Sequence, residues 1–403
     1  MATYRTRWIE KTLKIAAKQF PALILTGPRQ SGKTTLFHKL FDKTHRYVSL
    51  DDLEMRRMAI QDPALFIKNF EPPIIIDEIQ YAPDLLPYLK IWIDAHRSKK
   101  GQIILTGSQM FPLMKGVTES LAGRAAILTL LSFAAGETKK IAQTMRQNEI
   151  QNFIFYGGYP ELVLARKRNS RLWFSSYLQT YLERDLRQIQ TIGSLTDFQR
   201  FLELLATRHG QVLHLSQISN DLGVAVNTVK RWVSVLEATH QICLVKPYFK
   251  NAGKRLVKAP RVYFLDSGLL CYLQGVSSSQ QALAGMGAGQ RFEGLVISEI
   301  IRRFYAEGES PRVYWWRTSN GDEVDFVIEI SGRLYPIEVK MSSKESPGLA
   351  RGALLFQKLF KQQVERSYLV NFSTEQIEIA PGLFTLPWQD FLAGDWFRKA
   401  LGK

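Results

Sequence analysis

The stretch Gly27-Pro28-Arg29-Gln30-Ser31-Gly32-Lys33-Thr34 decides the fold of the N-terminal part of this chain. It follows the apolar run Ala22-Leu23-Ile24-Leu25 and precedes a segment, Thr35 to Phe41, that can form a helix. A strand, a glycine-rich loop and a helix in this order are typical of a phosphate-binding loop, where backbone N–H groups and the helix dipole surround the phosphates. Lys33 supplies a positive charge for the β- and γ-phosphates, and the Thr34 hydroxyl is a ligand for Mg²⁺. We therefore expect residues Gly27 through Thr35 to bind ATP together with Mg²⁺.

A second apolar stretch ends in two carboxylates, in Pro73-Ile74-Ile75-Ile76-Asp77-Glu78. Ligands of parallel α/β sheets lie at the carboxyl ends of the strands, so these acids are expected beside the loop. Asp77 would hold Mg²⁺ through water, and Glu78 would orient and polarise the attacking water. A strand followed by two acids is common by chance, but its position roughly 40 residues after a complete loop favours this interpretation.

Two further positions are candidates for contacts with the phosphates. The apolar stretch Ile103–Thr106 leads into Ser108 and Gln109, either of which could touch the γ-phosphate or the attacking water. An ordinary strand-to-loop turn is the alternative. Arg124 precedes the last candidate strand and could stabilise transition-state charge on a neighbouring subunit's nucleotide, which would require a homo-oligomer. A plain surface arginine is the alternative there.

The composition limits the class of protein. The chain has 403 residues, 45% of them hydrophobic and 22% charged, which indicates a globular protein of two or three domains. Its apolar runs fall short of the roughly 18 residues of a membrane span, and its two cysteines are too few for a disulfide framework, so we expect a cytoplasmic protein. The net charge of +16 favours a polyanionic partner such as DNA, with an anionic membrane surface as the rival.

The pattern of elements changes twice along the chain. From residue 20 to about 130, short apolar strands alternate with helical stretches, which predicts a parallel α/β sheet. The candidate strands are Leu23–Thr26, Tyr47–Leu50, Ile74–Ile76, Ile103–Thr106 and Ala126–Leu130. Helical periods dominate from about 150 to 275, and a stretch rich in Ser, Gly, Gln and Ala then resembles a linker. Beyond it we expect a helix, three strands, a second helix and a final strand.

Several motifs in a fixed order resemble those of one family. They are Gly27-Pro28-Arg29-Gln30-Ser31-Gly32-Lys33-Thr34-Thr35-Leu36, Ile76-Asp77-Glu78-Ile79-Gln80, Leu105-Thr106-Gly107-Ser108, Ser120-Leu121-Ala122-Gly123-Arg124, Gly157-Gly158-Tyr159-Pro160-Glu161, Tyr181-Leu182-Glu183-Arg184-Asp185, Lys254-Arg255-Leu256-Val257-Lys258 and Tyr263-Phe264-Leu265-Asp266-Ser267-Gly268. Together they resemble a widespread prokaryotic group of AAA-type ATPases that carry a C-terminal domain of unassigned function. The resemblance covers nearly the whole chain and implies architecture more than a cellular role.

The segment from Leu215 to Glu237 is predicted to be a helix-turn-helix. Ser216 would cap the first helix, Gly223 would form the turn, and a second helix from Asn227 would expose Lys230 and Arg231. A basic stretch follows that would form the wing of a winged helix on a nucleic-acid backbone. Its basic and aromatic residues are Lys246, Lys250, Lys254, Arg255, Lys258, Arg261, Tyr248 and Phe249. A scaffolding role as a nucleotide lid or protein contact is the alternative.

In the C-terminal segment, Asp325 and the sequence Glu338-Val339-Lys340 have an informative spacing. Two predicted strands, Glu323–Ile330 and Arg333–Lys340, are joined by a Ser331-Gly332 turn, and their pairing would bring the three side chains together. Two carboxylates suit Mg²⁺ or Mn²⁺, and a lysine beside them can stabilise a hydroxide or the scissile phosphate. A preceding helix, Gln290–Phe304, could add Glu293 or Glu299 to the site.

The element order and these residues resemble the PD-(D/E)XK nuclease fold of junction resolvases and restriction endonucleases. By that resemblance the metal carboxylates are Asp325 and Glu338, the catalytic lysine is Lys340, and the helical glutamate is Glu293 in preference to Glu299. We therefore expect an AAA-like P-loop domain over 1–145, a helical lid and winged helix over 146–275, a linker over 276–289 and a nuclease-like α+β domain over 290–403. The expected function is an ATP-hydrolysing, DNA-directed protein. An ATP-switched binding protein with an inactive nuclease-like domain, or a membrane- or protein-associated signalling ATPase, is the alternative.

Overall fold

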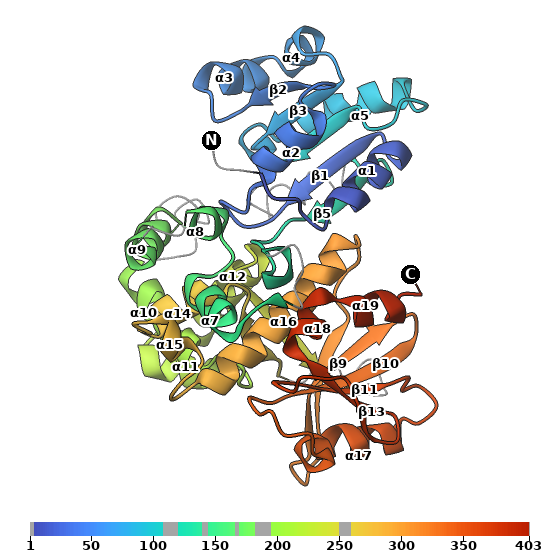
Figure 1. Ribbon diagram of the computed structural model, residues 1–403. Coiled ribbons are helices and arrows are strands. Elements are labelled where there is room, and N and C mark those ends of the chain that lie inside the picture. The colour runs from blue at the N-terminus through green and yellow to red at the C-terminus, as the bar shows by residue number, and fades with distance from the viewer. Residues whose placement is uncertain are drawn as a thin grey trace.

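The computed structural model describes residues 4–107, 120–138, 144–165, 169–181, 195–249 and 259–402. Its N-terminal part contains a five-stranded sheet in the order β2-β3-β4-β1-β5, with every pair parallel (Figure 1). The strands are β1 (Ala22–Thr26), β2 (Arg46–Ser49), β3 (Ile74–Asp77), β4 (Ile103–Thr106) and β5 (Ala125–Thr129). The helices are α1 (Glu10–Gln19), α2 (Lys33–Phe41), α3 (Leu53–Gln61), α4 (Pro63–Asn69) and α5 (Leu85–Ala95). The predicted parallel sheet is therefore confirmed.

Strand β1 is apolar throughout because helices cover both faces of this sheet. Leu23 and Leu25 pack with residues of α1 and α2, whereas Ile24 packs in a second cluster with residues of α3, α4 and α5. The strand is completely buried as a result. The loop after β1 leaves from the carboxyl end of this buried strand.

The middle part is helical, as the sequence indicates. Its helices are α7 (Gln147–Tyr156), α8 (Pro160–Leu164), α9 (Ser170–Tyr181), α10 (Leu195–Thr207), α11 (Leu215–Leu222), α12 (Val226–Ala238), α14 (Ser267–Leu273) and α15 (Ser279–Ala282). Gly223 ends α11 in the left-handed conformation, with φ of 69°, and Lys230 and Arg231 are exposed on α12. Ser216 does not cap α11, because the helix already begins at Leu215 and has His214 in the N-cap position.

The C-terminal part contains an eight-stranded mixed sheet in the order β12-β13-β11-β10-β9-β8-β6-β7. Its strands are β6 (Ile242–Pro247), β7 (Arg261–Phe264), β8 (Val313–Arg317), β9 (Glu323–Ile330), β10 (Arg333–Val339), β11 (Ser367–Asn371), β12 (Glu378–Ala380) and β13 (Leu383–Pro387). The helices of this part are α16 (Ala288–Ala306), α17 (Arg351–Leu359), α18 (Trp388–Ala393) and α19 (Asp395–Ala400). The expected order of helix, three strands, helix and strand is present in α16, β8, β9, β10, α17 and β11.

The hairpin β6–β7 differs from the expected free wing, because β6 pairs with β8 and so extends the C-terminal sheet. Tyr248, just after β6, is 4% exposed and packs against Phe356 and Phe360, so it is a core residue. Arg261 is buried as well, whereas Lys246 is exposed. The other lysines and the arginine of the predicted wing, residues 250, 254, 255 and 258, lie outside the described residues.

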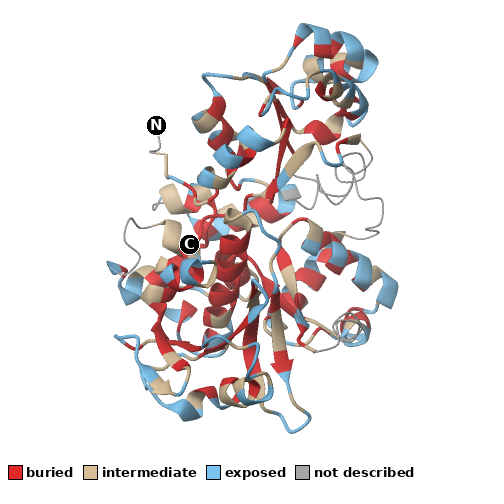
Figure 2. Ribbon diagram, turned by 90° about the vertical axis from the view of Figure 1, so that its right-hand side faces the viewer, coloured by how far each residue is buried: buried red, intermediate tan, exposed pale blue. Residues whose placement is uncertain are grey.

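Two observations tie the parts of the molecule together. The stretch 276–289 is not an open linker, because it contains α15, whose Ala282 is completely buried. Helix α16 runs between the helical part and the C-terminal sheet (Figure 1), and most of its residues are buried (Figure 2). In the described parts of the chain, every helix is too short or too polar to cross a lipid bilayer.

Candidate functional site

The loop between β1 and α2 has the backbone geometry of an anion site. Gly27 has φ of 138°, and a Cβ atom there would lie 2.0 Å from the carbonyl oxygen of Leu130. Gly32 has φ of 92° and precedes the first residue of α2, so the amino end of the helix opens onto the loop. Lys33 Nζ donates to the carbonyl oxygens of Gly27 (3.1 Å) and Pro28 (2.9 Å). Among the described residues the buried Ser31 hydroxyl has no hydrogen-bond partner, so it can still form a hydrogen bond with a ligand.

The first predicted carboxylate, Asp77, ends β3 beside this loop. Its Oδ2 accepts hydrogen bonds from the hydroxyls of Thr34 (2.9 Å) and Tyr47 (2.6 Å), and Oδ1 accepts one from Thr106. Burial and this bond to Asp77 raise the pKa of Tyr47 above its ordinary range, which keeps it a donor. The loop threonine and the strand aspartate thus face each other, as a shared Mg²⁺ ligand pair requires.

The second predicted carboxylate, Glu78, begins the loop after β3 in the left-handed conformation, with φ of 59°. Glu78 accepts a hydrogen bond from Gln80 and lies 4.0 Å from the guanidinium of Arg29. It lines the same cavity of about 510 Å³ as Lys33 and Thr34. An acid in this position can accept a hydrogen bond from water next to a bound phosphate.

The opposite wall of that cavity comes from the helical part, with Pro160, Glu161, Tyr177 and Thr180. Tyr177 is fixed by hydrogen bonds of 3.0 Å from the hydroxyl of Tyr159 and from Gln241 Nε2. An adjoining cavity of about 400 Å³ is more apolar and contains Tyr4, Phe133 and Leu164 together with residues of the loop and α2. The cavity of about 510 Å³ suits the phosphates of a nucleotide, and the more apolar cavity of about 400 Å³ suits its base. The residues present therefore fit ATP and Mg²⁺.

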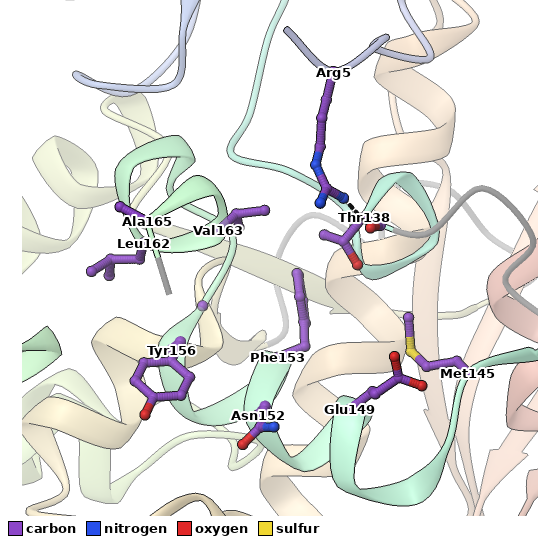
Figure 3. A pocket seen from close by; sticks show the side chains of 11 residues that line it. Arg5, Thr138, Met145, Glu149, Asn152, Phe153, Tyr156, Leu162, Val163 and Ala165 are labelled. Atoms are coloured by element: carbon purple, nitrogen blue, oxygen red, sulfur yellow. Dashed lines mark hydrogen bonds between the residues drawn. The ribbon is translucent and has the colours of Figure 1, made fainter. Parts of the chain in front are cut away.

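A further cavity of about 440 Å³ lies below α8 and beside α7 (Figure 3). Arg5 reaches into it and donates to the carbonyl oxygen of Thr138, and Glu149 and Asn152 face it from α7. It shares Arg5 and Ala165 with the cavity of about 400 Å³. Among the residues that the structure describes, those that line it do not include a sequence-predicted site residue.

Two predicted phosphate contacts have different outcomes. Ser108 and Gln109 lie outside the described residues, and Thr106, the last residue of β4, contacts Asp77 instead. Strands β1 and β5 are parallel and in register. Arg124 precedes β5 and therefore lies at the amino ends of the strands, whereas the loop lies at their carboxyl ends. Arg124 forms a two-point ion pair with Asp94 (2.9 and 3.0 Å), and this bond lowers the pKa of Asp94. Arg124 therefore does not face the nucleotide cavity of its own chain.

The C-terminal sheet brings the predicted D…ExK residues together. Strands β9 and β10 pair antiparallel, and Lys340 Nζ lies 3.3 Å from Asp325 Oδ2 and 3.0 Å from Glu338 Oε2. Both carboxylates are buried, with 5% and 3% exposure. Burial opposes the charge of Lys340, but the two adjacent acids outweigh it and raise the pKa of the lysine. Gly352 of α17 closes the site, since a Cβ there would lie 2.8 Å from Glu338 Oε1.

The two helical glutamates have different surroundings. Glu293 accepts a hydrogen bond from the hydroxyl of Tyr263 and lies 3.9 Å from Arg261, both on β7. Burial, and then the charge of Asp325, raise its pKa. Glu293 thus lies close enough to Asp325 to sense its charge, but in the described ranges no group of three or more His, Cys, Asp or Glu side chains is placed to hold a metal ion, so Glu293 does not complete a three-carboxylate site with Asp325 and Glu338. Glu299, the second choice, accepts from the backbone N–H of Ala135 at 2.7 Å and joins α16 to the N-terminal part.

Sequence reasoning missed the residues that reach a site from another segment. Tyr47 and Thr106 had a signal, because both lie on strands next to β3. Tyr177 had none. Tyr263 and Asp266 belong to a motif of the family resemblance, but the motif does not indicate their partners, which are set by the packing of distant segments. Asp266 accepts from Ser132 Oγ (3.1 Å) and from the backbone N–H of Gly158 (2.9 Å).

Comparisons with known proteins divide the chain into three matched stretches. Residues 19–139 match the family described as an AAA domain, and residues 147–280 and 288–391 match two domains of unknown function (DUF8612 and DUF4143). Uncharacterized proteins of Mycobacterium tuberculosis and Mycobacterium bovis are each 30% identical over 383 residues, which is 94% of this chain and 80% of theirs.

Solved structures show weaker likeness. The Walker-type ATPase PABY2304 of Pyrococcus abyssi is 14% identical with a TM-score of 0.44, covering 66% of this chain and 94% of that one. The RuvB Holliday junction branch migration motor of Thermotoga maritima is 17% identical with a TM-score of 0.32, covering 62% of this chain and 93% of that one.

Proposed function

The chain belongs to the same protein family as the two mycobacterial proteins and carries an AAA-type P-loop ATPase domain, and we propose that it binds Mg²⁺·ATP and hydrolyses it. The single observation that carries the proposal is the convergence of Lys33, Thr34 and Glu78 on one cavity, with Asp77 bonded to Thr34. Each task of phosphoryl transfer to water then has a side chain of the required chemistry in reach.

The roles follow from the contacts. Lys33 would exchange its two loop carbonyls for the β- and γ-phosphate oxygens, which are stronger partners for an ammonium group. Thr34 and Asp77 would hold Mg²⁺, which supplies charge neutralisation between the phosphates when it is bound. Glu78 would accept a hydrogen bond from the attacking water and so aim its lone pair at the γ-phosphorus. The water oxygen would bond to that phosphorus while the bond from the phosphorus to the bridging oxygen of ADP breaks, one proton of the water would pass to Glu78 and then to solvent, and ADP and phosphate would leave.

Binding and turnover test the ATPase separately. We expect Lys33→Ala to lose nucleotide binding in calorimetry with Mg²⁺ present. Glu78→Gln should bind ATP with wild-type affinity and release almost no phosphate, because the amide cannot accept the proton of the water. Normal turnover in Glu78→Gln would remove the role given to this residue.

We further propose that the protein acts on DNA. The net charge of +16 and the exposed Lys230 and Arg231 on α12 support a phosphate-backbone contact by a helix-turn-helix. Helices α11 and α12 followed by the β6–β7 hairpin have the order of a winged helix, although the hairpin is engaged in the C-terminal sheet. A filter-binding titration at low and high salt tests this, since binding through phosphates weakens steeply with salt.

For the C-terminal site we propose metal-dependent cleavage of phosphodiesters in a fold like that of PD-(D/E)XK nucleases. Asp325 and Glu338 would hold Mg²⁺ or Mn²⁺, and the ion would activate water and neutralise the scissile phosphate. Lys340, already bonded to both acids, would stabilise the negative charge that develops on the phosphate. Glu293 would join the metal ligands only after leaving Tyr263. Asp325→Ala should abolish cleavage of a DNA panel and leave ATP turnover intact.

A second candidate function is ATP-switched binding by a C-terminal domain that does not cut. The hydrogen bond that holds Glu293 on Tyr263, and the ion pairs that Lys340 makes with both acids, favour it. Absence of cleavage by the wild type on duplex, single-stranded and branched DNA with either metal would support this second candidate. A homo-oligomer in which Arg124 acts in trans also remains a proposal, and it would require Arg124 to leave Asp94.

A further inference from the structure

Arg7 lies outside every motif of the chain; it contacts the phosphate-binding loop at Ser31 and lines the adjoining cavity of about 400 Å³. The residue is 6% exposed, and its Nη1 donates to the carbonyl oxygen of Ser31 at 3.1 Å. In a trans peptide the carbonyl and the next N–H point in opposite directions. Because Arg7 binds the Ser31 carbonyl, the N–H of Gly32 is oriented the other way, toward the phosphate site. Gly32 lines the cavity of about 510 Å³.

The same arginine is anchored to the chain that leaves β5. Nη2 donates to the carbonyl oxygens of Leu131 (2.8 Å) and Ser132 (3.3 Å), and Nε is paired with Glu137 at 3.2 Å. Four carbonyl or carboxylate groups thus fix one guanidinium group, whose planar fork is suited to several simultaneous bonds. The position of the loop consequently depends on the position of Ser132.

Arg302 of α16 binds Ser132 from the other side. Its Nε donates to the Ser132 carbonyl at 3.1 Å, and Nη2 donates to Ser132 Oγ at 3.0 Å and to the carbonyl of Leu265 at 2.7 Å. Arg302 is 6% exposed, so water competes little for these bonds. Two buried arginines, one in contact with the loop and one on α16, therefore share a single carbonyl oxygen.

Helix α16 extends the connection to the C-terminal site. Arg302 lies 9 residues after Glu293 on this helix, a rise of about 13.5 Å at 1.5 Å per residue. Glu299, on the same helix, is bonded to the backbone of Ala135. A shift of α16 would therefore move both Ser132 and the glutamate beside Asp325.

We propose that Arg7 and Arg302 are paired positioning residues that couple the phosphate-binding loop to α16 through Ser132. Nucleotide binding at the loop and the packing of α16 against Ser132 then stabilise each other. The inference rests on the proposed binding of ATP at the loop. Coupling between sites is reciprocal and typically changes an affinity by about 5- to 150-fold.

The test is nucleotide affinity in a variant that does not touch the nucleotide cavity. Arg302→Lys keeps the charge, but its single nitrogen cannot occupy both positions from which Nε and Nη2 of Arg302 bond Ser132 and the Leu265 carbonyl. Titration calorimetry of the full chain with Mg²⁺·ATP should give a Kd about tenfold weaker than wild type. Arg291→Lys is the matched control: Arg291 is also buried on α16 but donates to the carbonyls of Ala282 and Gln281, away from Ser132. Its Kd should stay within about twofold of wild type, even if both variants lose similar stability.

A second readout does not depend on the fold of Arg302→Lys. In the wild type, ATP should slow backbone amide exchange in the second half of α16. Ser132→Ala, which removes only the hydroxyl bonds, should reduce that protection. Equal Kd values for wild type and Arg302→Lys, or α16 exchange that ATP leaves unchanged, would overturn the coupling. Failure of the wild type to bind ATP would instead remove the proposed function on which it rests.

Discussion

Asp266 lies where three segments meet, and its removal should destabilise the whole chain. One carboxylate oxygen accepts from Ser132 Oγ (3.1 Å) and the N–H of Gly158 (2.9 Å), and the other accepts from the N–H groups of Gly268 (3.1 Å) and Leu269 (3.0 Å). The residue is 4% exposed. A single side chain thus joins the exit of β5 and the start of α8, and caps α14.

The magnitude follows from the groups that Asp266→Ala would leave without a partner. Three backbone N–H groups at about 1–2 kcal/mol each give about 3–6 kcal/mol of lost stability. Unfolding entropy of about 2.1 cal/mol/K per residue, over 403 residues, is about 0.85 kcal/mol/K. The unfolding midpoint should therefore fall by about 4–7 °C if the chain unfolds as one unit.

Scanning calorimetry of two variants measures this effect. Asp266→Asn keeps one acceptor oxygen and should lose about half as much as Asp266→Ala, since roughly two of the four bonds can be retained. Asp94→Ala, which removes the solvent-facing ion pairs with Arg124 and Arg97, serves as the control and should shift the midpoint by less than about 1 °C. If Asp266→Ala unfolded within about 1 °C of wild type, the argument that this carboxylate holds the junction would be wrong.

Three further predictions test other parts of the structure. Burial lowers the pKa of His209 from its ordinary value near 6.5 to about 3, so its contribution to stability is present above pH 6.5 and is lost as the pH falls toward 3. Between pH 7 and pH 5 the free energy of unfolding from denaturant titrations should therefore fall by about 2 kcal/mol less in His209→Asn than in the wild type. Equal decreases in the two proteins would contradict the lowered pKa of His209. Gly27→Ala should abolish ATP binding in calorimetry because its Cβ would meet the Leu130 carbonyl, whereas Gly123→Ala, with positive φ but open space around it, should bind ATP normally. Arg124→Ala should keep ATP affinity and lower kcat by about 10³-fold if it acts in trans; unchanged kcat would leave it only as the partner of Asp94.

The local parts of both candidate sites could be predicted from the sequence. The loop from Gly27 to Thr34 and the carboxylate Asp77 are set by strand and helix patterns that act over a few residues, and β3 is a neighbour of the strand that pairs with β1. The turn at Ser331-Gly332 likewise brings Asp325 and Lys340 together across one hairpin. In the hairpin the contact depends on alternation along the strands, and in the loop it depends on a short motif between a strand and a helix; the sequence displays both directly.

The contacts between segments could not be predicted in this way. The basic and aromatic residues around Tyr248 are typical of a wing. However, β6 pairs with β8 in the C-terminal sheet, and Tyr248 is buried in its core. The composition around Ala282 predicted a linker, because small residues are common in flexible segments. They also pack well in a buried helix, so composition does not distinguish the two. Glu293 was chosen from its place in a helix, whereas its bond to Tyr263 depends on β7.

The sequence alone determined that a phosphate-binding loop and an acid-ended strand belong to one parallel sheet, because backbone propensity and side-chain alternation are local properties. Only the tertiary structure decided that Ser132 is held by Arg7 on one side and Arg302 on the other, and that Asp266 joins distant segments. The physical reason is that a buried polar group must find a partner, and residues 100 or more positions away supply it only when the chain has packed.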